Sequence, residues 1–139
     1  METEADPHGL VEQPDRWSLN VGAGVVTQLQ IDFAFGFTLE QRLYFRVETP
    51  FAFGAEGDAT EYEPEDSATL CPLLDLHQAR VVAGDVFKDG RLVVRFAGGK
   101  TLFVPPHDQY EAFQVTGSRM ENTKFHLIAL PGGGLAEWT

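Results

Sequence analysis

The stretch LQIDFAFGFTL, residues 29–39, alternates apolar residues with polar or small ones over its whole length. The apolar positions are Leu29, Ile31, Phe33, Phe35, Phe37 and Leu39. Because successive side chains of a strand point to opposite faces of a sheet, this period of two predicts a strand with one buried side. The stretch is long for one flat strand, so Gly36 predicts a bend or bulge within it.

Later segments extend this β pattern. RLYFRV, residues 42–47, repeats the alternation and predicts an antiparallel partner for the first strand. Asp89-Gly90 predicts a tight hairpin, because both central residues of a type I′ turn need positive φ. Eleven Phe residues among 139 suit a packed β interior. The sequence therefore predicts a mainly β fold, a single-domain antiparallel β-sandwich or small barrel with one short helix.

The one helical segment is EDSATLCPLLDLHQ, residues 65–78. Its apolar face, at spacings of three and four, consists of Leu70, Leu73, Leu74 and His77. Asp66 or Ser67 is a suitable N-cap, and Pro72 limits the helix to one or two turns. Cys71 lies on the apolar face, which favours a buried thiol over a nucleophile.

The net charge of −11 is concentrated in two segments. Residues 1–16 hold five acids against Arg16, and residues 54–66 hold six acids and no base, so together they carry ten of the eleven net charges. Residues 1–16 lack any apolar period and are predicted to be a disordered acidic tail. Residues 17–139 are predicted to form a single β-rich domain that is close to neutral apart from its acidic loop.

Composition also excludes several classes of protein. Clustered Lys and Arg are missing, which argues against binding to nucleic acid. No apolar run reaches about eighteen residues, and the N-terminus lacks the pattern of a secretory signal, so we expect no membrane association. A single Cys permits no internal disulfide and fits the cytoplasm.

The stretch VPPHDQYEAFQV, residues 104–115, gathers four side chains that can move a proton or bind a ligand: His107, Asp108, Tyr110 and Glu111. A metal site needs three or four suitable ligands, and no second Cys or His cluster accompanies these. The alternative is a corner in which Asp108 bonds the backbone two residues on, and Tyr110 and Phe113 enter the core. We favour the corner, and predict no catalytic residue, no metal and no cofactor.

Seven stretches carry a resemblance to a known family: W-S-L at 17–19, V-E-T-P-F at 47–51, E-P-E-D at 63–66, P-L-L at 72–74, D-G-x-L at 89–92, V-P-P-x-x-x-Y-E-A-F at 104–113 and P-G-G-G-L-A-E-W at 131–138. Through them the chain resembles small uncharacterised bacterial proteins, a domain of unknown function, over nearly its whole length after the tail. The family often carries Trp where this chain has Phe113, and either residue keeps an aromatic anchor. The resemblance implies a single domain and assigns no catalytic residue.

Two function classes follow. The first is a non-enzymatic protein-interaction module: an immunity-type protein that masks a basic partner, or a self-associating protein that forms a homo-dimer through a strand edge or an aromatic patch. The second is a small-ligand-binding protein or enzyme with a Phe-lined pocket, in which His107, Asp108, Tyr110 and Glu111 form the polar rim. We favour the first class, because ordinary core filling explains the Phe content.

Overall fold

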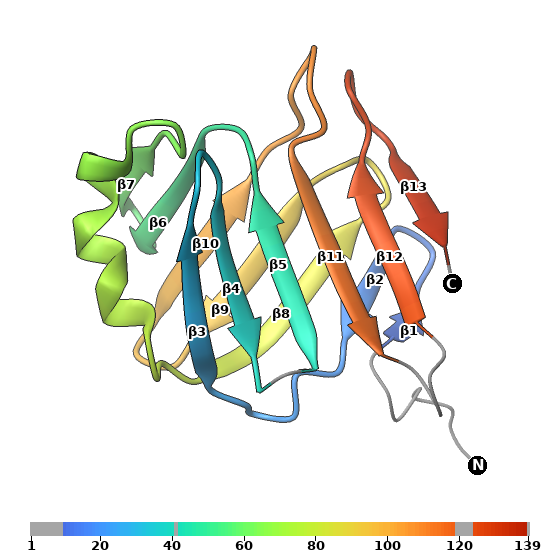
Figure 1. Cartoon of the computed structure of the whole chain (residues 1–139). Coiled ribbons are helices and arrows are strands. Elements are labelled where there is room, and N and C mark those ends of the chain that lie inside the picture. Colours follow the sequence, from blue (N-terminus) through green and yellow to red (C-terminus); the bar gives the residue numbers. More distant parts are fainter. Residues whose placement is uncertain (1–9, 41, 119–123, 139) are drawn as a thin grey trace.

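The computed structural model describes residues 10–40, 42–118 and 124–138, which form two antiparallel β-sheets packed face to face (Figure 1). The seven-stranded sheet has the order β1-β2-β8-β9-β10-β6-β7. Its strands are β1 (Leu10–Glu12), β2 (Arg16–Leu19), β8 (Val81–Phe87), β9 (Leu92–Phe96), β10 (Lys100–Val104), β6 (Phe51–Ala55) and β7 (Asp58–Tyr62). The six-stranded sheet has the order β13-β12-β11-β5-β4-β3. Its strands are β13 (Leu135–Trp138), β12 (Lys124–Ala129), β11 (Phe113–Ser118), β5 (Leu43–Val47), β4 (Phe35–Leu39) and β3 (Val26–Ile31).

The predicted β-sandwich is confirmed, and the sheets do not close into a barrel. Strand β5 shows why the alternation was informative: Leu43, Phe45 and Val47 are at most 1% exposed, while the residues between them are half-buried. The largest buried aromatic side chains, each at most 1% exposed, are Phe35, Phe37, Phe45, Phe51, Phe113 and Phe125. Several of these rings pack on one another, with Phe37 stacked on Phe45 at 4.6 Å between centroids. These six phenylalanines therefore fill much of the core between the sheets.

The stretch 29–39 is a hairpin and not one bent strand. Strands β3 and β4 pair antiparallel, and the chain reverses at Asp32, Phe33 and Ala34. Phe33 has φ +71° and is 83% exposed, although the alternation placed it inside. A period of two is unchanged by a three-residue reversal, so the pattern could not report the turn. Ile31, just before the turn, was also placed inside and is 39% exposed. Gly36 lies within β4, where an added Cβ would be 3.0 Å from Tyr44 Oη, so the glycine leaves room for that side chain.

The ordered part begins earlier than residue 17. Leu10–Glu12 forms strand β1, which pairs with β2 and places Leu10 opposite Leu19. Leu10 is 3% exposed, and Glu12 binds Lys88 with 2.5 Å between the charged atoms. Residues 10–16, assigned to a disordered tail from the sequence, are therefore part of the sheet. A three-residue strand is too short to show a period, which is why its apolar burial was missed. Residues 1–9 of the predicted tail lie outside the described residues.

The helical segment is a 3-10 helix, η1 (Ser67–Leu76), and it lies along the side of the sandwich next to β3 and β7 (Figure 1). Its buried residues are Leu70, Leu73 and Leu76, three apart as three residues per turn require. Leu74 is 52% exposed and His77 is exposed, so the predicted face with spacings of three and four is wrong. Cys71 is exposed as well, contrary to the predicted buried thiol. Asp66 occupies the N-cap position without a side-chain capping bond.

The predicted Asp89-Gly90 hairpin is confirmed between β8 and β9, with one difference in geometry. Gly90 has φ +102°, whereas Asp89 is not among the residues with positive φ, so the turn is not type I′. Phe87 N donates a hydrogen bond to Arg91 O at 2.8 Å, so residues 88–90 form a three-residue hairpin loop. Gly90 is the residue of this loop that has positive φ.

Candidate functional site

The residues 105–112 connect β10 to β11 at one end of the sandwich. Gln109 N donates to His107 Nδ1 at 3.0 Å, so His107 holds this turn in the role that we had predicted for Asp108. The carbonyl of His107 accepts a hydrogen bond from Gly132 N at 2.7 Å. His107 therefore fixes its own loop and ties it to the glycine-rich turn between β12 and β13.

The four predicted site residues do not converge on one point. Tyr110 packs against His107 with 5.1 Å between ring centroids, but it is 61% exposed and does not enter the core as we had predicted. The anchors of the loop are Ala112 and Phe113, both 0% exposed. Asp108 and Glu111 are exposed. In the part of the chain that the structure describes, no group of three or more His, Cys, Asp or Glu side chains is placed to hold a metal ion.

Three turns that are distant in the sequence interlock beside this loop. Gly134 N donates to Asp89 O at 2.9 Å, in addition to the bond between Gly132 and His107. A Cβ added to Gly90 would lie 3.0 Å from Gly134 O and 3.4 Å from Pro106 Cβ. These backbones can approach so closely because Gly90 lacks a side chain. The geometry of this end is that of a firmly held corner.

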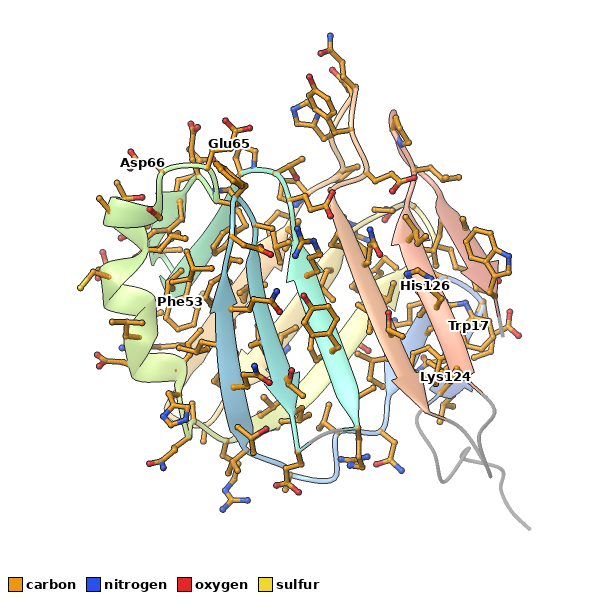
Figure 2. All side chains as sticks on the ribbon, viewed as in Figure 1. Trp17, Phe53, Glu65, Asp66, Lys124 and His126 are labelled. Atoms are coloured by element: carbon orange, nitrogen blue, oxygen red, sulfur yellow. The ribbon has the colours of Figure 1, made fainter. Side chains whose placement is uncertain are left out.

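A small concave site, the acidic hollow, lies between this corner and the start of η1. It has a volume of about 200 Å³ and is lined by Glu48, Thr49, Pro50, Glu63, Pro64, Glu65, His107 and Tyr110. Figure 2 shows Glu65 at that end of the molecule, next to Asp66 at the beginning of the helix. Thr49 is 4% exposed, and its Oγ1 has no hydrogen-bond partner within the described residues.

One carboxylate of the acidic hollow is already paired. Arg46 Nε donates to Glu48 Oε2 at 2.9 Å, and Arg46 Nη1 lies 3.1 Å from Asp32 Oδ1. Hydrogen bonds from Arg46 to Tyr44 and Glu48 raise the pKa of this guanidinium, so it stays charged at every relevant pH. Glu63 and Glu65 lie on the opposite side of the hollow, in the turn that follows β7. In this turn Asp66 N donates a hydrogen bond to Glu63 O at 3.0 Å. The hollow therefore keeps a negative balance after Glu48 is neutralised.

A larger concave site, the open-face groove, lies on the outer face of the seven-stranded sheet. Its volume is about 690 Å³. The side chains that alternate with the buried Leu102, Val94 and Val104 point away from the core and form its floor. From β8 across to β7, one row of paired residues is Ala83, Arg95, Thr101, Gly54 and Ala59. The next row is Asp85, Val93, Phe103, Ala52 and Glu61.

The floor of the open-face groove is made mostly of small side chains, so the sheet backbone lies near the surface there. Ala52, Gly54, Ala59 and Thr101 all line it, together with the ring of Phe103. An apolar chain can pack closely against such a floor, because no long side chain stands in the way. This makes the groove a candidate contact surface.

Two basic residues line the open-face groove without a partner. Neither Arg95 nor Lys100 makes a hydrogen bond or ion pair with any described residue, although the chain contains 21 acids. Six other basic side chains of the described part are engaged, whereas Lys124 on β12 has no hydrogen bond or ion pair to a described residue either. Arg16, Arg46, Lys88 and Arg91 pair with carboxylates, and Arg42 and Arg80 bind backbone carbonyls. Arg95 and Lys100, without a partner among the described residues, therefore make the groove a candidate place for an anionic group, although Glu56 also lines it.

A third surface lies at the C-terminal edge of the six-stranded sheet. His126 Nε2 and Gln114 Oε1 are 2.9 Å apart, and Trp138 lies 6.0 Å from His126 between ring centroids. The terminal strand β13 pairs with β12, but the side chain of Trp138 is 59% exposed. Figure 2 shows His126 and Lys124 on β12. This strand belongs to the six-stranded sheet, whereas the groove lies on the seven-stranded sheet.

Sequence reasoning did not single out Arg95 or Lys100. In RLVVRFA, residues 91–97, the alternation places Arg95 on the outward face, and this was the available sign that Arg95 is exposed. Nothing in the sequence says that the outward neighbours of Arg95 are Ala83 and Thr101, because those neighbours come from other strands. Pairing register alone brings the groove together.

Residues 17–139 match the family model described as "Family of unknown function (DUF6188)". This confirms the resemblance to a domain of unknown function. No curated protein matches the chain, and no solved structure matches it. Within the described residues, no helix is long and apolar enough to cross a membrane.

Proposed function

The chain belongs to DUF6188, a family of unknown function, and we propose from its geometry that it is a non-enzymatic protein-interaction module. The observation that carries the proposal is the open-face groove with Arg95 and Lys100, two cations that have no partner among the residues that the structure describes. A protein with a net charge of −11 that exposes these two cations beside apolar surface is suited to bind an anionic, partly apolar partner.

The shape of the groove favours a polypeptide over a small molecule. Its volume of about 690 Å³ is within the range of ligand sites, but it lies on an open sheet face. A small molecule there would keep much of its surface in water, whereas ligand pockets commonly bury most of theirs. An extended segment can instead lie along the floor, with apolar side chains against Phe103 and Val82 and an acidic side chain at Arg95. Arg is well suited to this contact because its planar donors bind a carboxylate in pairs.

We propose a cytoplasmic setting. The support for it is Cys71, a free and exposed thiol, which suits a reducing compartment. The partner is either a different protein or a second copy of this chain. An immunity-type role, in which the module masks a toxin domain, is one specific form of this function.

A site-specific photo-crosslinker tests the proposal. We expect p-benzoylphenylalanine at Val82, which is 53% exposed in the groove, to give a defined protein adduct in host lysate. The matched control carries the same group at Leu74, which is 52% exposed on η1. The adduct at Val82 should fall at least about fivefold in an Arg95→Glu/Lys100→Glu variant and at high salt, because exposed ion pairs are screened. Its mass then shows whether the partner is a second copy.

Two outcomes would reject this function. One is the absence of an adduct at Val82, and the other is the same set of adducts at Val82 and Leu74. Thermal melting of each variant verifies that the fold is retained.

A further inference from the structure

We infer that the acidic residues that precede strand β1 fold back across the open-face groove and bind Arg95 and Lys100 in competition with the partner. These residues form the N-terminal segment, residues 1–9, which holds three acids and no Lys or Arg: Glu2, Glu4 and Asp6. The competition rests on the function proposed for the groove, because it regulates access of the partner to that site. Three features support the inference: the direction in which the chain enters β1, the reach of nine residues, and charge.

The first support is the direction of β1, the edge strand of the seven-stranded sheet. Strand pairing places Leu10 of β1 in one row with Gly84 of β8 and Val94 of β9. Ala83 and Arg95 form the next row, on the side from which the chain reaches Leu10. The chain therefore enters β1 at the same end of the sheet at which the cations of the groove lie.

The second support is reach. Three strand intervals separate β1 from β9, and four separate β1 from β10. At about 4.8 Å per interval, Arg95 on β9 is about 14 Å across the sheet from β1, and Lys100 on β10 is about 19 Å across. An extended chain covers about 3.3 Å per residue, so Asp6 can lie about 13 Å from Leu10, and Glu2 about 26 Å from it. The N-terminal segment is therefore long enough to reach both cations.

The third support is charge complementarity. The two cations of the groove are exposed and have no partner among the described residues. Glu56, the acid among the lining residues, lies in the β6–β7 hairpin, so a chain that comes from β1 meets the cations first. Side chains alternate along an extended chain, which puts Glu2, Glu4 and Asp6 on one side of it. Pro7 favours this form at Asp6, because proline disfavours the α region for the residue before it.

Binding within one chain sets a threshold for other ligands. The N-terminal segment competes at an effective concentration of about 1 mM, as is usual for a short tether. Its exposed ion pairs are individually weak and are screened by salt, so the segment can be displaced. A partner that also packs apolar side chains on Phe103 and Val82 gains contacts that carboxylates do not make. The groove is therefore selective for a partner that combines both kinds of contact.

Paramagnetic relaxation in the whole protein tests the contact. A nitroxide is attached through Thr3→Cys in a Cys71→Ser background, and two-dimensional NMR at low ionic strength follows the broadening of backbone amides. The matched control carries Glu2→Gln/Glu4→Gln/Asp6→Asn, which keeps the tether and removes its charge. We expect broadening at residues 93–101 to be at least about twofold stronger with the native acids than in this control, because two exposed ion pairs shift an equilibrium by about that factor or more.

Two further measurements define the contact. The Arg95→Glu/Lys100→Glu variant should reduce the broadening to the level of the neutral control, and high salt should do the same. In a mixture of spin-labelled protein with isotope-labelled protein that lacks the nitroxide, the broadening should disappear, because the contact lies within one chain. Equal broadening in the neutral control, or broadening that persists in the mixture, would each overturn the inference; the second result would assign the contact to another copy.

The photo-crosslinker at Val82 separates this inference from the function of the groove. Neutralising the N-terminal segment should raise the yield of the partner adduct by at least about twofold, because a competitor is removed. Glu63→Gln/Glu65→Gln/Glu137→Gln makes the same change in net charge at exposed acids outside the groove, and it should leave the yield unchanged. A salt-sensitive adduct with equal yield in the native and neutralised proteins would overturn the competition and leave the proposed function standing. Broadening in the groove without any adduct at Val82 would support the contact within the chain and reject the proposed function.

Discussion

Replacing Thr49 with valine should make this protein more stable, although the change removes a hydroxyl from a native side chain. Thr49 is 4% exposed, and its Oγ1 is buried without a partner among the described residues. Mutational data put the cost of burying an unpaired hydroxyl at about 1–3 kcal/mol. Valine keeps the branched shape at Cβ and removes this cost. We therefore expect the free energy of unfolding to rise by about 1–2 kcal/mol, which corresponds to an increase in Tm of about 3–8 °C.

Urea denaturation followed by circular dichroism measures this change, with an unchanged m-value as the sign that the unfolded state is unaffected. Thr60→Val is the matched control, because Thr60 is exposed on β7 and its hydroxyl is hydrated in either state. The control should change stability by less than about 0.5 kcal/mol. If Thr49→Val were destabilising by about 1 kcal/mol or more, the hydroxyl would have a partner in the free protein.

Two further outcomes follow from the packing and exposure of single residues. Gly117→Ala should lower the free energy of unfolding by about 1–3 kcal/mol in the same urea assay. The reason is that the new Cβ would lie 2.5 Å from Phe125 Cε2 and 2.8 Å from Leu43 Cδ2. A change below about 0.5 kcal/mol would show that these two side chains move aside easily. Cys71 should react with a thiol reagent nearly as fast in the native protein as in urea, because it is exposed on η1. Absorbance measures the reaction, with the Cys71→Ser variant as the blank. A strongly protected thiol would contradict the exposed position.

The alternation of apolar residues predicted the faces of β4 and β5, but not of β3, where Ile31 is 39% exposed. In β5 every predicted inward residue is buried, and in β4 Phe35 and Phe37 are fully buried. Where the chain reverses was not predictable in the same way. The turn at Phe33 uses a bulky residue at φ +71°, and no Gly or Asn marks it.

The helix and the predicted corner show the same limit at a finer scale. Spacings of three and four describe an α-helix, but η1 has three residues per turn, so Leu76 is buried in place of Leu74. In the loop after β10, the sequence could indicate a turn because of its prolines. It could not show that His107, and not Asp108, accepts the bond that holds the turn. Both errors concern the neighbours of a side chain in the folded protein. A short-range sequence pattern does not specify those neighbours.

By itself the sequence determined a mainly β fold, a sandwich or a small barrel, with a phenylalanine core, because burial of one strand face follows from local alternation and needs no knowledge of partners. The tertiary structure decided for the sandwich, because the strands pair into two separate sheets. Only the tertiary structure decided where binding surfaces lie. Gly54, Ala83, Arg95 and Thr101 belong to four strands, and they become one surface because backbone pairing sets their register. Thr49, Glu63 and Tyr110 meet in the acidic hollow for a similar reason, since the packing of three separate loops places them together.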